Sequence, residues 1–187
     1  MRNLFFLFIM MCIAVPELPA QRCLPGMRGL QVTAGTVNGL NPKEGFHTGI
    51  ALSNYMKGAN RWVFGAEYLE KRHPYRDLRI PQSQFTVDAG YYLKFLSDPR
   101  KTFFASVGAS ALAGYETVNW SEKLLQDGAT VDSSDAFLYG GALTLELEIY
   151  LTDRFVLLTN VRERFLIGSS VGKFNTQLGI GIKIIIN

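Results

Sequence analysis

The sequence contains few cysteines, few histidines and no long apolar stretch, and each scarcity argues against a class of protein. The two histidines in 187 residues have no cysteine or carboxylate at ligand spacing, which argues against a zinc site. No run of 18 or more apolar residues is present, which argues against a helical membrane protein. The formal net charge is only +3, with Lys and Arg scattered among the acidic residues, so the basic stripe of a nucleic-acid-binding protein is missing as well.

The N-terminus has the three-part pattern of a secretory signal peptide. Arg2 gives a positive start, Leu4 to Val15 form an apolar run, and a short proline-containing stretch ends at Ala20. The apolar run is shorter than the roughly 20 residues that a transmembrane helix needs. We therefore expect residues 1–20 to be a signal peptide that is cleaved on export, and residues 21–187 to form a single domain.

Cleavage leaves Cys23 as the only cysteine of the mature chain, so no intramolecular disulfide can form. The residues before Cys12 and before Cys23 do not form the small-residue box of a lipoprotein. Two interpretations of Cys23 stay open. One is an intermolecular disulfide or another thiol attachment to a partner, and the other is a free cysteine tucked into the end of the fold.

The main positive feature of the chain is a period-two alternation of apolar and polar residues. It recurs in segments rich in aromatic and β-branched residues and bounded by Gly, Asn, Asp or Pro, which is typical of β-strands. In the sixth segment, Leu143, Leu145 and Leu147 share one face, while Glu146 and Glu148 share the other. The pattern predicts eight strands, at residues 29–37, 46–56, 61–71, 83–96, 102–116, 136–151, 155–166 and 173–186.

Connection lengths indicate which β-fold these strands form, because a soluble β-sandwich shows the same alternation. The predicted connections are about 8, 4, 11, 5, 19, 3 and 6 residues long, so long and short ones take turns. An up-and-down outer-membrane barrel has this asymmetry, with short periplasmic turns and longer external loops. We expect an all-β fold, an eight-stranded antiparallel up-and-down barrel of the outer-membrane type in that orientation.

The outward aromatic residues support the membrane interpretation, because they fall into two bands separated by Ala, Val, Leu and Ile. Aromatic girdles at both interfaces are typical of outer-membrane barrels. Near the short turns lie Trp62, Phe64, Phe95, Phe103 and Phe155. Near the long loops lie Phe46, Tyr68, Phe85, Tyr115, Phe137, Tyr139, Phe165 and Phe174.

The inward faces carry charges of both signs, and these predict a filled interior. An eight-stranded barrel has just enough room for its own side chains, and an unpaired buried charge is costly, so we expect a structural network of ion pairs. If the turn at residues 152–154 pairs Leu151 with Phe155, Glu146 lies diagonal to Arg162. The predicted interior network consists of Glu67, Asp88, Glu146, Glu148, Arg162 and Arg164, and Lys94 and Lys183 also face inward.

No pattern predicts a catalytic residue, a cofactor site or a metal site. Glu146 and Glu148 could act as an acid and a base only beside a substrate cleft, which a filled barrel lacks. We expect His47 and His73 to be ordinary exposed residues near the loop ends. A membrane-embedded hydrolase would need a Ser/His pair, and only Ser83 and His73 flank one loop.

The longest predicted loop, residues 117–135, contains Trp120, Leu124 and Leu125. Exposed apolar side chains on a long loop are typical of a contact with a protein partner. A loop that folds back over the barrel mouth would explain the same residues. Both interpretations stay open.

Several stretches along nearly the whole mature chain resemble the TraO family, the outer-membrane-associated transfer proteins of Bacteroidetes-type conjugative transposons. The stretches that carry the resemblance are residues 21–25 (QRCLP), 62–69 (WVFGAEYL), 101–104 (KTFF), 111–116 (ALAGYE), 150–154 (YLTDR) and 160–164 (NVRER). The chain departs from the usual barrel pattern at its end, where Asn187 stands in place of a terminal aromatic residue.

The resemblance implies a role in conjugative DNA transfer, with other transfer proteins as partners and with no catalytic residues. Because the interior is too narrow for DNA, we expect an accessory or scaffolding role in the outer membrane, with partner contacts through the loops or the Cys23 segment. The alternatives are a free-standing surface barrel of the adhesin or envelope-stress type, and a soluble periplasmic calycin-like binding protein.

Overall fold

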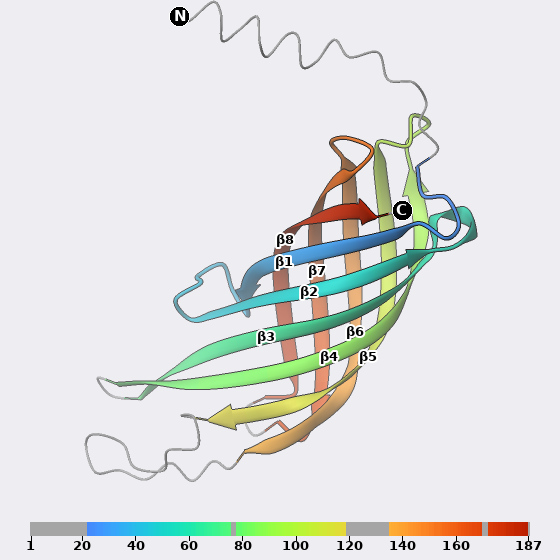
Figure 1. Ribbon diagram of the computed structural model, residues 1–187. Helices are drawn as coiled ribbons and strands as arrows, with labels where there is room; N and C mark the ends of the chain where they lie inside the picture. Colours follow the sequence, from blue (N-terminus) through green and yellow to red (C-terminus); the bar gives the residue numbers. More distant parts are fainter. Residues whose placement is uncertain (1–21, 76–77, 119–134, 170–171, 187) are drawn as a thin grey trace, which may run out of the picture.

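The computed structural model describes residues 22–75, 78–118, 135–169 and 172–186, and their strands form one closed antiparallel barrel (Figure 1). Each strand pairs with the next along the chain, and β1 closes the barrel against β8 from Arg28↔Ile186 to Val37↔Gln177. The predicted eight-stranded up-and-down topology is confirmed. The elements are β1 (Arg28–Val37), β2 (Gly45–Tyr55), η1 (Lys57–Ala59), β3 (Arg61–Tyr75), β4 (Leu78–Ser97), β5 (Phe103–Val118), β6 (Ala136–Tyr150), β7 (Phe155–Ile167) and β8 (Phe174–Ile186).

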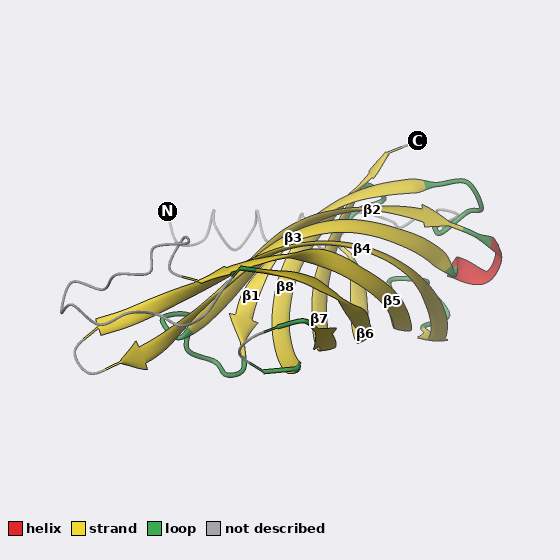
Figure 2. Ribbon diagram, turned by 90° about the horizontal axis from the view of Figure 1, so that it is seen from below, coloured by secondary structure: helices red, strands yellow, loops and turns green. Residues whose placement is uncertain are grey.

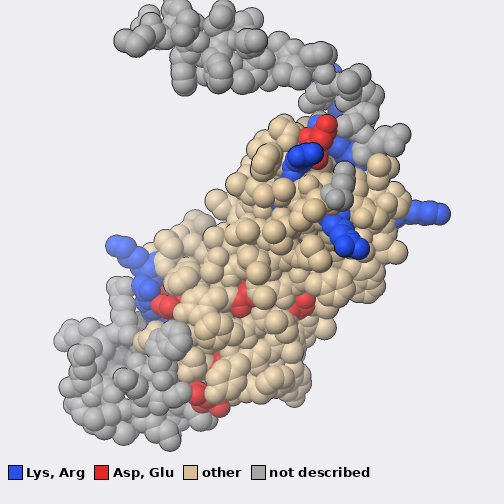
Figure 3. All heavy atoms as spheres, in the orientation of Figure 1, with Lys and Arg blue, Asp and Glu red and all other residues tan. Residues whose placement is uncertain are grey.

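The alternation in sequence becomes an apolar outer wall around a polar interior. In β6, Leu143 and Leu145 are exposed, whereas Thr144, Glu146 and Glu148 are buried. The strands are long and strongly coiled, so that β1 to β4 cross over β6 to β8 in projection (Figures 1 and 2). In the face shown in Figure 3, Lys and Arg gather toward the two ends, and most of the wall between them is uncharged.

The third connection differs from the prediction. Instead of a loop of about 11 residues, β3 and β4 continue as a paired ribbon from Arg72↔Pro81 to Tyr75↔Leu78, with only residues 76–77 between the two strands. The described pairing of β3 with β2 stops at Lys71, and that of β4 with β5 stops at Gln82. Residues 73–75 and 78–81 therefore extend past the described parts of the neighbouring strands. Prolines in this segment resemble a loop signal, but the edge of a two-stranded ribbon tolerates proline.

The two ends of the barrel are therefore unlike. At one end, which we call the turn end, the connections are residues 56–60, 98–102 and 151–154. At the other, the loop end, they are residues 38–44, 76–77, 119–135 and 168–173. Residues 22–27 lie against the turn end, where the Gly26 N–H donates to the Tyr55 carbonyl at 2.8 Å and the Tyr55 N–H donates to Met27 at 2.9 Å. Among the described residues, no helix is long and apolar enough to cross a membrane.

Candidate functional site: the barrel interior

The interior of the barrel holds two clusters of four charged side chains, each with two cations and two anions. The turn-end cluster consists of Arg61, Glu146, Glu148 and Lys183. The central cluster consists of Glu67, Asp88, Arg162 and Arg164. Each cluster is formally neutral, which is the condition under which buried charge can be tolerated.

In the turn-end cluster, Arg61 bridges the two carboxylates of β6. Its guanidinium lies 2.6 Å from Glu146 Oε1 and 3.1 Å from Glu148 Oε2, and Lys183 pairs with Glu148 and lies 3.7 Å from Glu146. The Tyr55 hydroxyl donates to Glu148 Oε1 at 2.7 Å. All four charged side chains are at most 2% exposed. This cluster is tightly enclosed, and each carboxylate has two cationic partners.

Aromatic rings enclose the same cluster. The Arg61 guanidinium carbon lies 5.7 Å from the centre of the Tyr55 ring and 5.2 Å from that of Tyr92, within cation–π distance. Toward the turn end, Tyr55 belongs to an apolar group that includes Phe104, Val156 and Ile185. Charges, rings and aliphatic side chains together close the lumen at this end.

In the central cluster, the ion pairs cross the lumen from β7 to β3 and β4. Arg162 lies 3.0 Å from Asp88 and 3.6 Å from Glu67, and Arg164 lies 2.8 Å from Glu67. The amide of Gln177 donates to Glu67 at 2.7 Å. Arg162 is 12% exposed and Glu67 is 8% exposed, so this cluster is less tightly enclosed than the turn-end cluster.

A small polar cavity of about 40 Å³ lies between the two clusters, bordered by Asp88, Glu146 and Arg162. Gln31 and His47 also line it, and the Gln31 oxygen and His47 Nδ1 are buried without a hydrogen-bond partner. A cavity of this size holds about one or two water molecules. The part of the chain that the structure describes contains no group of three or more His, Cys, Asp or Glu placed to hold a metal ion.

The structure brings all six residues of the predicted network into the interior and joins them in ion pairs. The predicted register of β6 with β7 is confirmed, because Glu146 stands opposite Asn160 and so diagonal to Arg162. Glu146 and Arg162 nevertheless form no ion pair with each other among the described contacts. Glu146 pairs instead with Arg61 and Lys183, and Arg162 pairs with Asp88. These partners reach one another across the lumen.

Sequence reasoning missed Arg61 and misjudged His47. Arg61 begins β3 on the same inward face as Val63 and Glu67, so the alternation of β3 was the signal that could have found it. His47 is 3% exposed, which overturns its expected place as an exposed residue. It fits inside because Gly35 and Gly179 lie beside its ring, where a Cβ would approach it to 2.6 and 3.2 Å.

Cys23 is buried at the turn end and faces Tyr150. Its Sγ lies 3.1 Å from the Tyr150 hydroxyl, and the thiol is 7% exposed. Burial raises the pKa of the Cys23 thiol to about 11, so the group is neutral at physiological pH. The adjacent Arg22 forms an ion pair with Asp153 at 3.3 Å. Cys23 is thus a free cysteine tucked into the end of the fold, as the second of the two interpretations expects, and its thiol is not presented to solvent.

The remaining predicted site residues are placed differently or lie outside the described part. Trp120, Leu124 and Leu125 lie outside the described residues, as does the His73 side chain. Lys94 is half-buried near the turn end, with Nζ 3.5 Å from the Ser97 hydroxyl. Ser83 is 1% exposed, and its hydroxyl lies 3.1 Å from that of Tyr68.

Comparison with solved structures places this barrel among outer-membrane barrels. Neisserial surface protein A matches over 85% of this chain and 96% of its own, with 14% sequence identity and a TM-score of 0.53. The N-terminal β-barrel domain of Pseudomonas aeruginosa OprF matches over 85% of this chain and 98% of its own, with 12% identity and a TM-score of 0.49. These likenesses concern the fold alone. Among curated proteins, no match was found.

A family model identifies the lineage of the chain. The model described as conjugative transposon protein TraO matches residues 24–186, which include all eight strands and both charged clusters. The match bears out the resemblance carried by the sequence motifs. The chain therefore belongs to the TraO family of conjugative transposon proteins.

Proposed function

We propose that this protein is a non-enzymatic outer-membrane component of a conjugative DNA transfer apparatus, and that it acts as an accessory or scaffolding part rather than as the DNA conduit. The observation that carries the proposal is the filled lumen. The two neutral clusters and the apolar group at the turn end occupy the interior, and the cavity between the clusters measures about 40 Å³. A lumen filled in this way supports a role other than that of the DNA conduit.

The outer wall supports the membrane location. Large apolar side chains such as Val87, Leu143 and Ile180 are 59–68% exposed, and a soluble protein rarely exposes a continuous belt of this kind. Following the usual asymmetry of such barrels, the turn end faces the periplasm and the loop end faces outward. Export through a cleaved signal peptide, residues 1–20, and contact with outer-membrane lipid belong to the same proposal.

The absence of catalysis is supported by the position of the candidate groups. His47 faces the interior and Ser83 is buried, so neither is presented to a substrate in the membrane or in solvent. Glu146 and Glu148 are both engaged by Arg61 in a buried cluster. Carboxylates held in this way serve the fold rather than acid–base chemistry.

Partners in this proposal are other proteins of the transfer apparatus, and nucleic acid is not contacted directly. Because the Cys23 thiol is buried, we favour the long loop with Trp120, Leu124 and Leu125 as the contact over a disulfide through Cys23. Trp is among the residues that most often dominate protein interfaces.

A mating assay tests the proposal. Deletion of the gene from a donor strain should lower the transfer of the conjugative element, and the wild-type gene supplied in trans should restore it. Replacement of Trp120, Leu124 and Leu125 by Ser should fail to restore transfer although the barrel still reaches the membrane fraction and shows heat-modifiable gel mobility. Undiminished transfer from the deletion strain would contradict a role in conjugation.

A further inference from the structure

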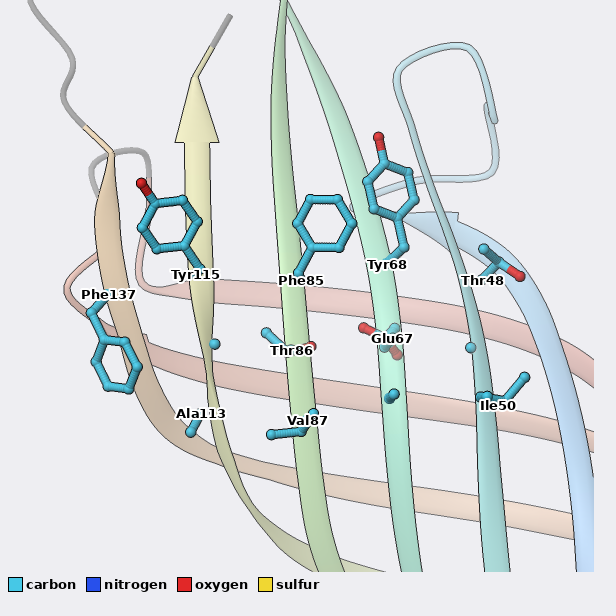
Figure 4. Close-up of a pocket in the computed structure, with 13 residues that line it drawn as sticks. Thr48, Ile50, Glu67, Tyr68, Phe85, Thr86, Val87, Ala113, Tyr115 and Phe137 are labelled. Atoms are coloured by element: carbon cyan, nitrogen blue, oxygen red, sulfur yellow. The ribbon is translucent and has the colours of Figure 1, made fainter. Parts of the chain in front are cut away.

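An apolar groove of about 570 Å³ crosses the outer wall of the barrel near the loop end (Figure 4). Its residues come from the five consecutive strands β2 to β6. The volume lies within the roughly 300–1,000 Å³ of small-molecule sites. The groove is distinct from the lumen, because its lining side chains Ile50, Val87 and Phe137 are 58%, 59% and 65% exposed on the outside.

Two neighbouring rows of residues produce the groove. One row is aromatic and consists of Tyr68, Phe85, Tyr115 and Phe137, each directly opposite the next in the strand pairing. The next row toward the middle of the barrel is Ile50, Ala66, Val87 and Ala113, again paired in order. The small side chains of Ala66 and Ala113 beside the tall rings leave a recess below the aromatic row, as Figure 4 shows for Ala113.

The polar atoms around the groove already have partners. The Tyr68 hydroxyl donates to Glu70 at 2.9 Å, the Tyr115 hydroxyl donates to Asp135 at 3.0 Å, and the Thr48 hydroxyl donates to the Thr33 carbonyl at 3.3 Å. The barrel is closed, so the groove has no free strand edge. An extended polypeptide would find no partner here for its backbone polar groups, which are costly to leave unpaired in lipid. A hydrocarbon chain needs none.

We infer that the groove binds one acyl chain of a membrane lipid. This inference rests on the membrane location in the proposed function, since the groove is continuous with the apolar belt that would contact lipid. The head group would lie beyond the aromatic row, where Tyr68, Glu70 and Arg72 follow one another on the outward face of β3. Arg72 is 40% exposed and 2.8 Å from Glu70, so its guanidinium is available to a phosphate.

The test uses Ala113→Leu, which fills the recess with an apolar side chain, and the matched control Ala109→Leu. Ala109 is exposed on the same outward face of β5 but lies outside the groove. The full mature protein is reconstituted into phosphatidylethanolamine vesicles, extracted with a mild detergent and examined by native mass spectrometry. Wild type and Ala109→Leu should each retain one phospholipid. Ala113→Leu should lower the lipid-bound fraction about tenfold, as expected for the loss of about two buried methylene contacts.

Equal retention by Ala113→Leu and wild type, or no retained lipid on a folded wild-type barrel, would overturn the inference. A barrel dimer that Ala113→Leu abolishes would also overturn it, because the groove would then be an interface between copies. Heat-modifiable mobility and membrane fractionation separate these outcomes from a failure of the proposed function. A soluble protein would end both proposals, whereas a membrane-inserted barrel without bound lipid would end this inference alone.

Discussion

The two charged clusters inside the barrel have the same composition, two cations and two anions, but different surroundings. In the turn-end cluster, Arg61 is completely buried between Tyr55 and Tyr92, and both carboxylates are at most 2% exposed. In the central cluster, Arg162 is 12% exposed and borders the polar cavity. The cavity borders three of the four charged side chains of the central cluster but only Glu146 of the turn-end cluster, and an apolar group covers the turn-end cluster on its other side.

This difference indicates that the lumen is closed more tightly at the turn end than at its centre. An isolated charge in a dry site costs far more than one that water can reach. Equivalent substitutions in the two clusters should therefore have unequal costs, and the turn end should be the part of the barrel least tolerant of change.

The largest effect should come from Arg61→Met. The substitution leaves Glu146 and Glu148 buried, with Lys183 as the remaining cation of the cluster, and breaking a buried pair in this way costs about 3–5 kcal/mol. We expect a loss of unfolding free energy of that size, measured by urea unfolding in lipid vesicles with tryptophan fluorescence. A loss below about 1 kcal/mol would show that the cluster is hydrated.

Arg162→Met should have a smaller effect. Glu67 keeps Arg164 as a partner, and water from the cavity can solvate Asp88, so we expect a loss of about 1–3 kcal/mol. The same urea titration measures this loss of unfolding free energy, with Arg61→Met examined in parallel. If Arg162→Met proves the more damaging of the two, the contrast drawn between the clusters is wrong.

The buried Cys23 thiol gives a third, chemical comparison. Because burial raises its pKa to about 11, the folded protein should resist maleimide labelling at pH 7–8 and react only when unfolded. The control is the double variant Cys23→Ala/Arg100→Cys, whose thiol lies in an exposed turn and should react at once. Rapid labelling of folded wild-type protein would show that residues 22–27 do not stay docked at the turn end.

The same raised pKa sets a direction for stability at high pH. The folded state holds the protonated thiol more strongly than the unfolded state, whose value is near 9.0. The protonated Cys23 thiol therefore makes its full contribution to the free energy of unfolding below pH 9, and this contribution is lost as the pH rises toward about 11. Wild type should lose its stability advantage over Cys23→Ala across that interval, measured as the difference in urea midpoint at pH 8 and pH 11.

The smallest effect should come from Asp98→Asn in an exposed turn. The Phe103 N–H donates to Asp98 Oδ1 at 2.8 Å, and this hydrogen bond lowers the pKa of the carboxyl below its ordinary 3.8. A lowered pKa stabilises the folded state above pH 4, and the contribution is lost as the pH falls through the folded value. The small difference in midpoint between wild type and Asp98→Asn should thus be present at pH 7 and vanish in acid.

Local alternation was sufficient to predict the strands, because each inward or outward position follows from its neighbours two residues away. It was also sufficient to place Glu67, Asp88 and Arg162 inside. It could not predict that Arg162 pairs with Asp88, since the two lie on strands that meet only across the lumen. That geometry depends on the tilt and stagger of the closed barrel, which no short segment encodes.

Two other features were hidden for different physical reasons. Among the described residues, no further strand pairs with the β3–β4 ribbon past Lys71, so its residues lack the alternation that a buried face imposes. The groove depends on side-chain height, with Ala113 beside Tyr115 and Val87, rather than on the apolar or polar character that the alternation records. Sequence patterns of hydrophobicity do not distinguish a flat apolar wall from a recessed one.

The most direct test of the central claim, that the lumen is filled and the barrel is not a conduit, is the electrical conductance of the purified protein in planar lipid bilayers. A filled lumen should give insertion without steady conductance steps, with a trimeric porin as the positive control. Insertion should be verified by heat-modifiable mobility of the same sample. Stable, voltage-independent conductance by the folded wild-type barrel would show instead that the lumen is open.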